Sequence, residues 1–94
     1  MRKNLSLIQN HLWTYRKKMG LSQKRVAYYA GLKTTNAFSK YEHGGKLPNL
    51  KNALKLEIVY RTPVAFLFPD LYGRLRNEIR QREEKLRKDL KSEE

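Results

Sequence analysis

The sequence predicts an all-α protein, with five short helices in a domain of residues 1–70 and a charged amphipathic helix in residues 71–94. Three observations predict this fold. Apolar residues recur at steps of three and four in successive stretches, which is the spacing of one helix face. Glycines, prolines and short polar residues that begin or end helices stand between those stretches. From Leu71 onward nearly every polar residue is charged, as in a solvent-exposed helix.

The first helix is expected over about residues 7–19, ended by Gly20. Its apolar stripe consists of Leu5, Ile8, Leu12, Tyr15 and Met19. Two shorter helices follow, joined by a tight turn. Ser22 and Thr34 are suited to cap their starts, and Gly31 stands where the helix end needs a left-handed residue. Their inward residues are predicted to be Val26, Ala27, Ala30, Leu32, Phe38 and Tyr41.

The fourth and fifth helices are expected between a glycine-containing loop and Asp70. Asn49 would cap the fourth, and Pro63, preceded by Thr62 as a cap, would open the fifth. The inward residues expected of the fourth are Leu50, Ala53, Leu54 and Ile58, and the apolar residues of the fifth are Val64, Phe66, Leu67 and Phe68. Glu57 either pairs with Arg61 four residues on or marks a local difference in packing.

The C-terminal stretch has acidic residues four positions before basic ones, as in Glu84 and Lys88. Its apolar residues share an arc of about 100°: Leu71, Leu75, Ile79, Leu86 and Leu90. Arg82 interrupts this stripe and argues against a long self-sufficient coiled coil. The stripe is expected to be covered by a partner subunit, by the chain's own domain or by another protein, unless the helix is frayed and solvated.

The net charge of +12 is concentrated in the first part of the chain. Residues 1–69 hold 13 Lys and Arg against only Glu42 and Glu57, which indicates a polyanion, and therefore nucleic acid, as the partner. The alternative is a charge that only aids solubility. The absence of cysteine excludes disulfides and thiolate metal sites and is compatible with the cytoplasm, where we expect the protein. No apolar run has membrane-spanning length.

The stretch from Gly20 to Pro48 resembles the helix-turn-helix of the Xre/Cro-type phage and bacterial repressors. The resemblance rests on Gly20, Leu21, Ser22, Gln23, Ala27, Ala30, Gly31, Leu32, Ser39, Lys40, Tyr41, Glu42, Gly44 and Pro48. This chain has one residue more than the family between Gly31 and the inward residue of the second helix. Placing it near Lys33 keeps Phe38 and Tyr41 inward and avoids burying Lys40. The resemblance also implies an Arg16–Glu42 ion pair, although Arg16 could instead face a DNA phosphate.

The resemblance makes the second helix of the motif, Thr34–Glu42, the recognition helix that enters the major groove. The residues expected to reach base edges are Thr35, Asn36, Ser39 and Lys40. The residues expected at phosphates are Gln23, Lys24, Lys33, His43 and Lys46. The alternative is that these side chains form only the solvated face of a helix.

The function that this implies is a sequence-specific regulator of double-stranded DNA, a repressor that binds a near-palindromic operator as a homodimer. The expected pairing surface combines the fifth helix, with Phe66 and Phe68, and the stripe of the C-terminal helix. The alternative is an antitoxin-like interaction module whose C-terminal helix binds a partner protein; RNA binding is a weaker third. The sequence contains no catalytic or metal-ligand motif, so we expect neither an enzyme nor a cofactor.

Overall fold

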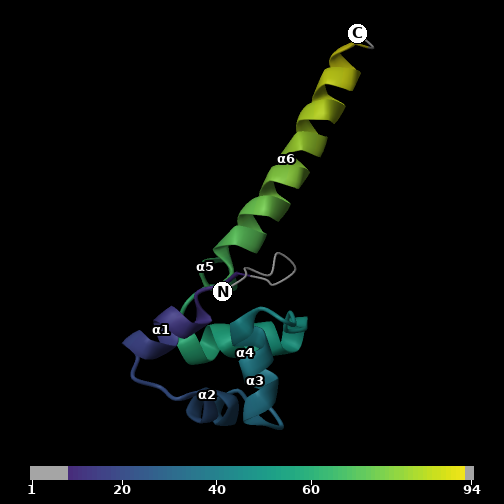
Figure 1. Cartoon of the computed structure of the whole chain (residues 1–94). Helices are drawn as coiled ribbons and strands as arrows, with labels where there is room; N and C mark the ends of the chain where they lie inside the picture. Colours follow the sequence, from purple (N-terminus) through teal and green to yellow (C-terminus); the bar gives the residue numbers. More distant parts are fainter. Residues whose placement is uncertain (1–8, 93–94) are drawn as a thin grey trace, which may run out of the picture.

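A computed structural model describes residues 9–92, which form six helices and no strand. They are α1 (Leu12–Lys18), α2 (Gln23–Tyr29), α3 (Thr35–His43), α4 (Leu50–Tyr60), α5 (Val64–Leu67) and α6 (Pro69–Ser92). The first five gather into a globular head, and α6 projects from it (Figure 1). The predicted all-α class is therefore confirmed. None of the helices in this part of the chain combines the length and the hydropathy needed to cross a membrane.

Each of the first five helices contributes one fully buried side chain to a single core. These are Leu12, Val26, Phe38, Leu56 and Leu67, and Ala27, Ala30, Tyr41, Tyr60 and Phe68 complete the buried cluster. A core of this size is what a head of fewer than 70 residues can form. It fixes α3 against its neighbours, with one face inside and the other in solvent.

The start of α1 differs from the expectation. The helix begins at Leu12, not near residue 7, because Asn10 and His11 are bonded to other parts of the chain. The His11 backbone N–H donates to the Leu67 carbonyl at 2.8 Å, and the Asn10 side-chain amide donates to the Tyr41 carbonyl at 3.0 Å. Leu5 and Ile8 lie outside the described residues, and Met19 is 41% exposed beyond the helix end.

The inward face predicted for α4 is wrong at three of its four residues, and only Ala53 is half-buried. Leu50 and Ile58 are about three-quarters exposed and Leu54 is 47% exposed, whereas Leu56 and Tyr60 are buried. The Tyr60 hydroxyl donates to the Leu12 carbonyl at 2.9 Å inside the core, which fixes the rotation of the helix. Asn49 caps α4 as expected, accepting a hydrogen bond from the Asn52 backbone N–H at 2.8 Å.

The start of α5 is capped by a residue from α4. Glu57 Oε1 accepts from the Val64 backbone N–H at 3.0 Å, whereas the hydroxyl of Thr62, the expected cap, donates to the Tyr60 carbonyl. Pro63, expected as the first residue of this helix, is instead the residue just before it. Phe68 is buried in the core, which removes it from the expected pairing surface, while Phe66 is 61% exposed.

The long helix α6 begins at Pro69 and has no fully buried residue. Its 24 residues span about 36 Å. It gives the chain extents of 58 × 33 × 23 Å and a radius of gyration of 17.2 Å, against about 12 Å for a compact domain of this length. Leu71 packs against the core, whereas Leu75, Ile79, Leu86 and Leu90 are about half-exposed. Glu84 pairs with Arg87, three residues on; the sequence suggested Lys88.

Candidate nucleic-acid interface

Local hydrogen bonds set the boundaries of α2 and α3. Ser22 Oγ accepts from the Arg25 backbone N–H, and Thr34 Oγ1 accepts from the Ala37 backbone N–H, both at 3.0 Å. Gly31 ends α2 at φ 67°, and the Leu32 N–H then donates to the Ala27 carbonyl at 2.9 Å. This closing bond between residues five apart is typical of a glycine-terminated helix.

The rotation of α3 is the one expected with an extra residue in the turn. Phe38 is fully buried and Tyr41 is 5% exposed, while Lys40 faces solvent. Thr35 and Asn36, at the start of α3, are also exposed. Ser39 is half-buried, and its hydroxyl lies 3.1 Å from His43 Nδ1 one turn later. The four predicted base-contacting residues thus lie outside the core, with Thr35 and Asn36 at the open end of the helix.

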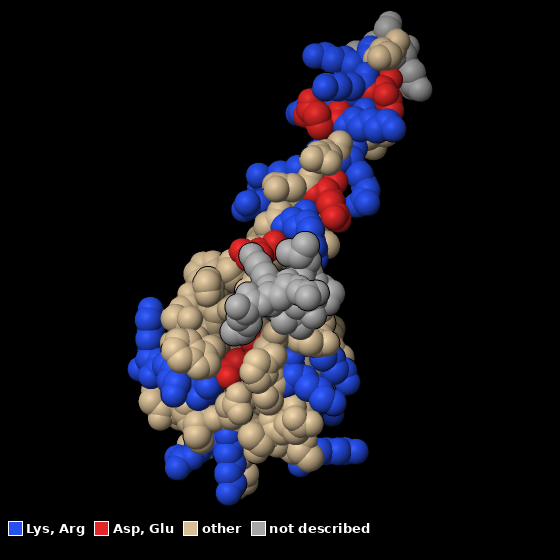
Figure 2. Space-filling model, viewed as in Figure 1, with Lys and Arg blue, Asp and Glu red and all other residues tan. Residues whose placement is uncertain are grey.

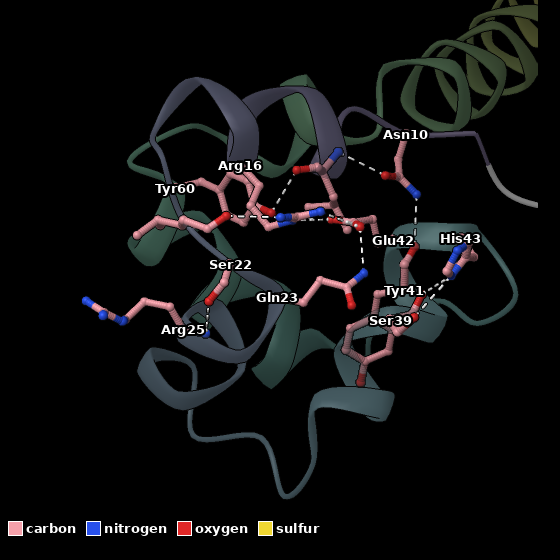
Figure 3. A network of polar contacts seen from close by, with 12 residues as sticks. Asn10, Arg16, Ser22, Gln23, Arg25, Ser39, Tyr41, Glu42, His43 and Tyr60 are labelled. Atoms are coloured by element: carbon pink, nitrogen blue, oxygen red, sulfur yellow. Dashed lines mark hydrogen bonds and ion pairs between the residues drawn. The ribbon is translucent and has the colours of Figure 1, made fainter.

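A buried ion pair joins α1 to α3 (Figure 3). Arg16 Nε lies 2.7 Å from Glu42 Oε2, its second guanidinium nitrogen lies 2.9 Å from Oε1, and both side chains are over 90% buried. A third guanidinium nitrogen donates to the Leu21 carbonyl. Burial alone would raise the pKa of Glu42, but the hydrogen bonds from Arg16 and Gln23 lower it below its ordinary value. The bidentate geometry suits a pair removed from water, because both charges keep their hydrogen bonds.

Basic side chains surround the end of the head that α2 and α3 form. Figure 2 shows Lys and Arg projecting from this end, opposite α6, with few acidic residues on the head. Lys24, Lys33 and Lys46 are all exposed. Lys55 of α4 also reaches the turn between α2 and α3: its Nζ lies 3.7 Å from where a Cβ on Gly31 would stand. An exposed helix start ringed by cations is suited to a polyanionic ligand.

A helix-turn-helix family model matches residues 14–67, more than half of the chain, and includes all of α2 and α3. The chain belongs to the Xre/Cro-like helix-turn-helix family. It is accordingly a DNA-binding transcription regulator. No curated protein and no solved structure matches the chain significantly.

The structure of this Xre/Cro-like protein gives Gln23 a role that the sequence did not reveal. Gln23 was expected at a phosphate, but its side-chain amide donates to Glu42 Oε1 at 2.8 Å, so it also ties α2 to α3. A phosphate contact would have to use the second N–H of that amide or the start of α2. No sequence pattern links positions 23 and 42; their proximity comes from helix packing.

Two asparagines were also missed. Asn10 bridges α1 and α3, since its oxygen accepts from the Leu12 N–H while its amide donates to the Tyr41 carbonyl. Asn52 of α4 donates to the Tyr41 hydroxyl at 2.9 Å. Both bonds hold Tyr41 and hence the C-terminal half of α3.

Among residues 9–92, no three His, Asp or Glu side chains gather as they would around a metal ion.

Proposed function

We propose that the protein is a sequence-specific repressor of double-stranded DNA, with α3 entering the major groove N-terminus first. The observation that carries this proposal is the orientation of α3: Phe38 and Tyr41 are buried, so Thr35 and Asn36 are presented at its exposed start. Asn can bond adenine N6 and N7 together, and the Thr methyl can contact a thymine methyl. Ser39 and Lys40 lie one turn further along and would read or contact the flanking positions.

Contacts to phosphates would position the head on the duplex. Lys24, Lys33, Lys46 and His43 are exposed at or beside α2 and α3. We add Lys55, because its ammonium group lies at the turn between the two helices. Gln23 would contribute from the start of α2. Such contacts give affinity and register but carry no sequence information.

One α3 covers only a few base pairs, so we propose that two copies bind a near-palindromic operator. A two-fold axis would present the two α3 helices to successive major grooves about 34 Å apart. Phe66 is 61% exposed on α5 and offers an apolar contact for this pairing. The cytoplasmic location expected from the sequence remains a proposal.

The test is to select bound sequences from random duplexes and to measure affinity across salt concentrations. We expect a two-fold-related motif and a preference for it of at least about a thousandfold over random duplex at moderate salt. Equal binding of selected and random duplexes would contradict the proposal. Activity of a reporter placed behind the selected site would separate repression from activation.

A second function, antitoxin-like capture of a partner protein, is favoured by one observation: the apolar residues of α6 are exposed along its length. Such a protein would also bind its own operator, so DNA binding alone does not separate the two functions. A short adjacent gene for a nuclease-like toxin, and a stable complex of its product with the full chain but not with a chain ending at Asp70, would favour this second function.

A further inference from the structure

An apolar seam runs along α6 without a covering partner in this chain. Its positions alternate by four and three residues, giving the average spacing of 3.5 that lets two helices stay in contact. They are Tyr72, Leu75, Ile79, Arg82, Leu86 and Asp89, of which Arg82 and Asp89 are charged. From Tyr72 to Leu86 the apolar members are 46–59% exposed. We propose that α6 of a second copy covers this seam, running antiparallel, and that the pair joins two DNA-binding heads facing away from each other.

The charges on the seam disfavour a parallel pair. In a parallel pair each seam residue meets its own copy, so Arg82 would face Arg82 and Asp89 would face Asp89. Residues beside the seam would contact the residue five positions later on the other helix, so Glu78 would meet Glu83 of the second copy. Each of these three contacts places like charges together in a partly desolvated interface, which costs free energy.

The antiparallel arrangement removes all three like-charge contacts. In the proposed register the numbers of any two facing residues, one from each copy, add up to 161. Leu75 then faces Leu86 of the second copy. Ile79 faces Arg82, whose aliphatic stem can pack over Ile79. The flanking pairs become Arg76 with Glu83 and Glu78 with Lys85, each formed twice by symmetry. In this register Pro69 faces Ser92, so the helices overlap over their whole length.

The base of α6 has a place for the far end of the second helix. An apolar groove between α5 and α6 is lined by Val64, Ala65, Phe68, Leu71, Tyr72 and Leu75. A second hollow, which shares Tyr72 and Leu75, continues the groove toward Ile79. In the proposed register the far end of the second helix passes along this groove, with its Leu86 opposite Leu75 and its Asp89 opposite Tyr72.

This pairing has a consequence for DNA, which rests on the proposed function. The α2–α3 end of the head points away from α6 (Figure 1). An antiparallel pair therefore places the α2–α3 ends of the two heads at opposite ends of the assembly. The two α5 helices are then far apart as well. The same two chains cannot also pair through Phe66 on one operator. The Phe66 contact would form the operator dimer, and α6 would join it to a chain bound on another duplex segment.

Charge exchange at position 83 tests the direction of the pairing. The experiment uses sedimentation equilibrium of the full chain at low salt, in a Phe66→Ser background that removes the other proposed surface. Glu83→Arg should raise the dissociation constant about tenfold, because the introduced guanidinium would meet Arg76 twice. Arg76→Glu combined with Glu83→Arg should restore association. Glu84→Arg, the same charge change on the outer face, is the matched control and should have little effect.

Two other results of this experiment would contradict the antiparallel pairing. A parallel pair would become tighter with Glu83→Arg, since the change relieves the Glu78 contact, and an unchanged constant would show that α6 does not pair with itself. Because the chain has no cysteine, single spin labels provide a second measurement. Labels at Gln81→Cys should lie close together and labels at Lys91→Cys about 30 Å or more apart. Equally short distances at both positions would overturn the antiparallel arrangement.

Bridging of DNA is measured separately. Beads carrying one duplex with the selected site should retain a second, fluorescent duplex when the chain is added. Glu83→Arg should reduce the retention, and the double exchange should restore it. Retention that does not respond to these changes would overturn the bridging role, even if each duplex is bound. Failure to bind either duplex in solution would instead contradict the proposed function, while sedimentation would still decide how α6 pairs.

Discussion

Glu42 accepts three hydrogen bonds that hold α1, α2 and α3 together, two from Arg16 and one from Gln23. Its carboxylate is thus surrounded by donors although it is removed from water. Loss of either charge would leave the other one buried without its partner, which is the costly case for a buried ion pair. The orientation of α3, and with it the proposed base-contacting surface, depends on this residue.

Replacing Glu42 tests this dependence. Glu42→Gln should lower the free energy of unfolding by about 3 kcal/mol at neutral pH. Because folding lowers the pKa of Glu42 below its ordinary value of 4.5, its contribution is complete above that pH and is lost as the pH falls through the folded pKa. Chemical unfolding followed by circular dichroism at several pH values should therefore show the difference from the wild type shrinking below about pH 4. A difference that stays constant with pH would contradict this explanation.

Asn36 and Phe38 are two positions apart on α3 but face opposite ways. Asn36→Ala should cost about 1–3 kcal/mol on the preferred duplex and little on random duplex, as loss of a bidentate base contact does. Phe38→Ala should lower the free energy of unfolding by about 3–5 kcal/mol. Binding titrations and thermal unfolding of both variants separate the two effects. If the selected motif changed with Ala37 or Lys33 and not with Asn36, the proposed reading surface would be wrong.

Helices α2, α3 and α4 each end at a residue with left-handed backbone conformation, which is glycine in two cases and arginine in the third. Gly31 and Gly44 close α2 and α3 at φ 67° and 82°, where glycine has no steric penalty. Arg61 closes α4 at φ 52° with a side chain present. The Thr62 N–H still donates to the Glu57 carbonyl at 3.2 Å, and the Glu57 side chain then caps α5, so the link from α4 to α5 keeps Arg61 in this conformation.

These positions should respond to substitution with opposite signs. Arg61→Gly should raise the free energy of unfolding by roughly 0.5–1 kcal/mol, because it removes the penalty of a Cβ in the left-handed region. Gly31→Ala should lower it by about 1 kcal/mol for the same reason. A Cβ on Gly31 would only make ordinary contact with Lys55 Nζ at 3.7 Å, so the cost is in the backbone. Thermal unfolding of both variants is the measurement, and a loss with Arg61→Gly would show that the Arg61 side chain itself contributes.

The whole molecule is divided between a basic head and a C-terminal stretch, residues 70–94, that holds 8 Lys and Arg against 7 Asp and Glu. Lys and Arg residues project from the end of the head opposite α6 and from its flanks, as Figure 2 shows. The proposed DNA contacts and the proposed pairing through α6 would thus lie at opposite ends of the molecule. Binding that rests on phosphate contacts releases counterions and weakens as salt rises.

The salt dependence should report individual phosphate contacts. Lys46→Ala should weaken binding to all duplexes alike and reduce the slope of log affinity against log salt by about one. Lys91→Ala, at the far end of α6, is the matched control and should leave the slope unchanged. Titrations of selected and random duplexes at several salt concentrations measure both. A slope unaffected by Lys46→Ala would exclude that side chain from the phosphate contacts.

The sequence by itself determined the all-α class, the family and the rotation of α3. These depend on local signals: Ser22, Thr34 and Asn49 accept hydrogen bonds at helix starts, Gly31 ends a helix, and Phe38 and Tyr41 lie one turn apart. The resemblance to known repressors also paired Arg16 with Glu42, which the structure brings to 2.7 Å. The base and phosphate contacts remain predictions.

Only the tertiary structure decided which face of α4 is buried, what caps α5 and what Gln23 contacts. α4 has apolar residues at helical spacing on two faces, so periodicity could not choose between Leu50, Leu54 and Ile58 and the buried pair Leu56 and Tyr60. The choice follows from the hydrogen bond of Tyr60 to Leu12, 48 residues away. Likewise Glu57 meets Val64, and Gln23 meets Glu42, only once the helices have packed, because these contacts join residues whose spacing in sequence carries no signal.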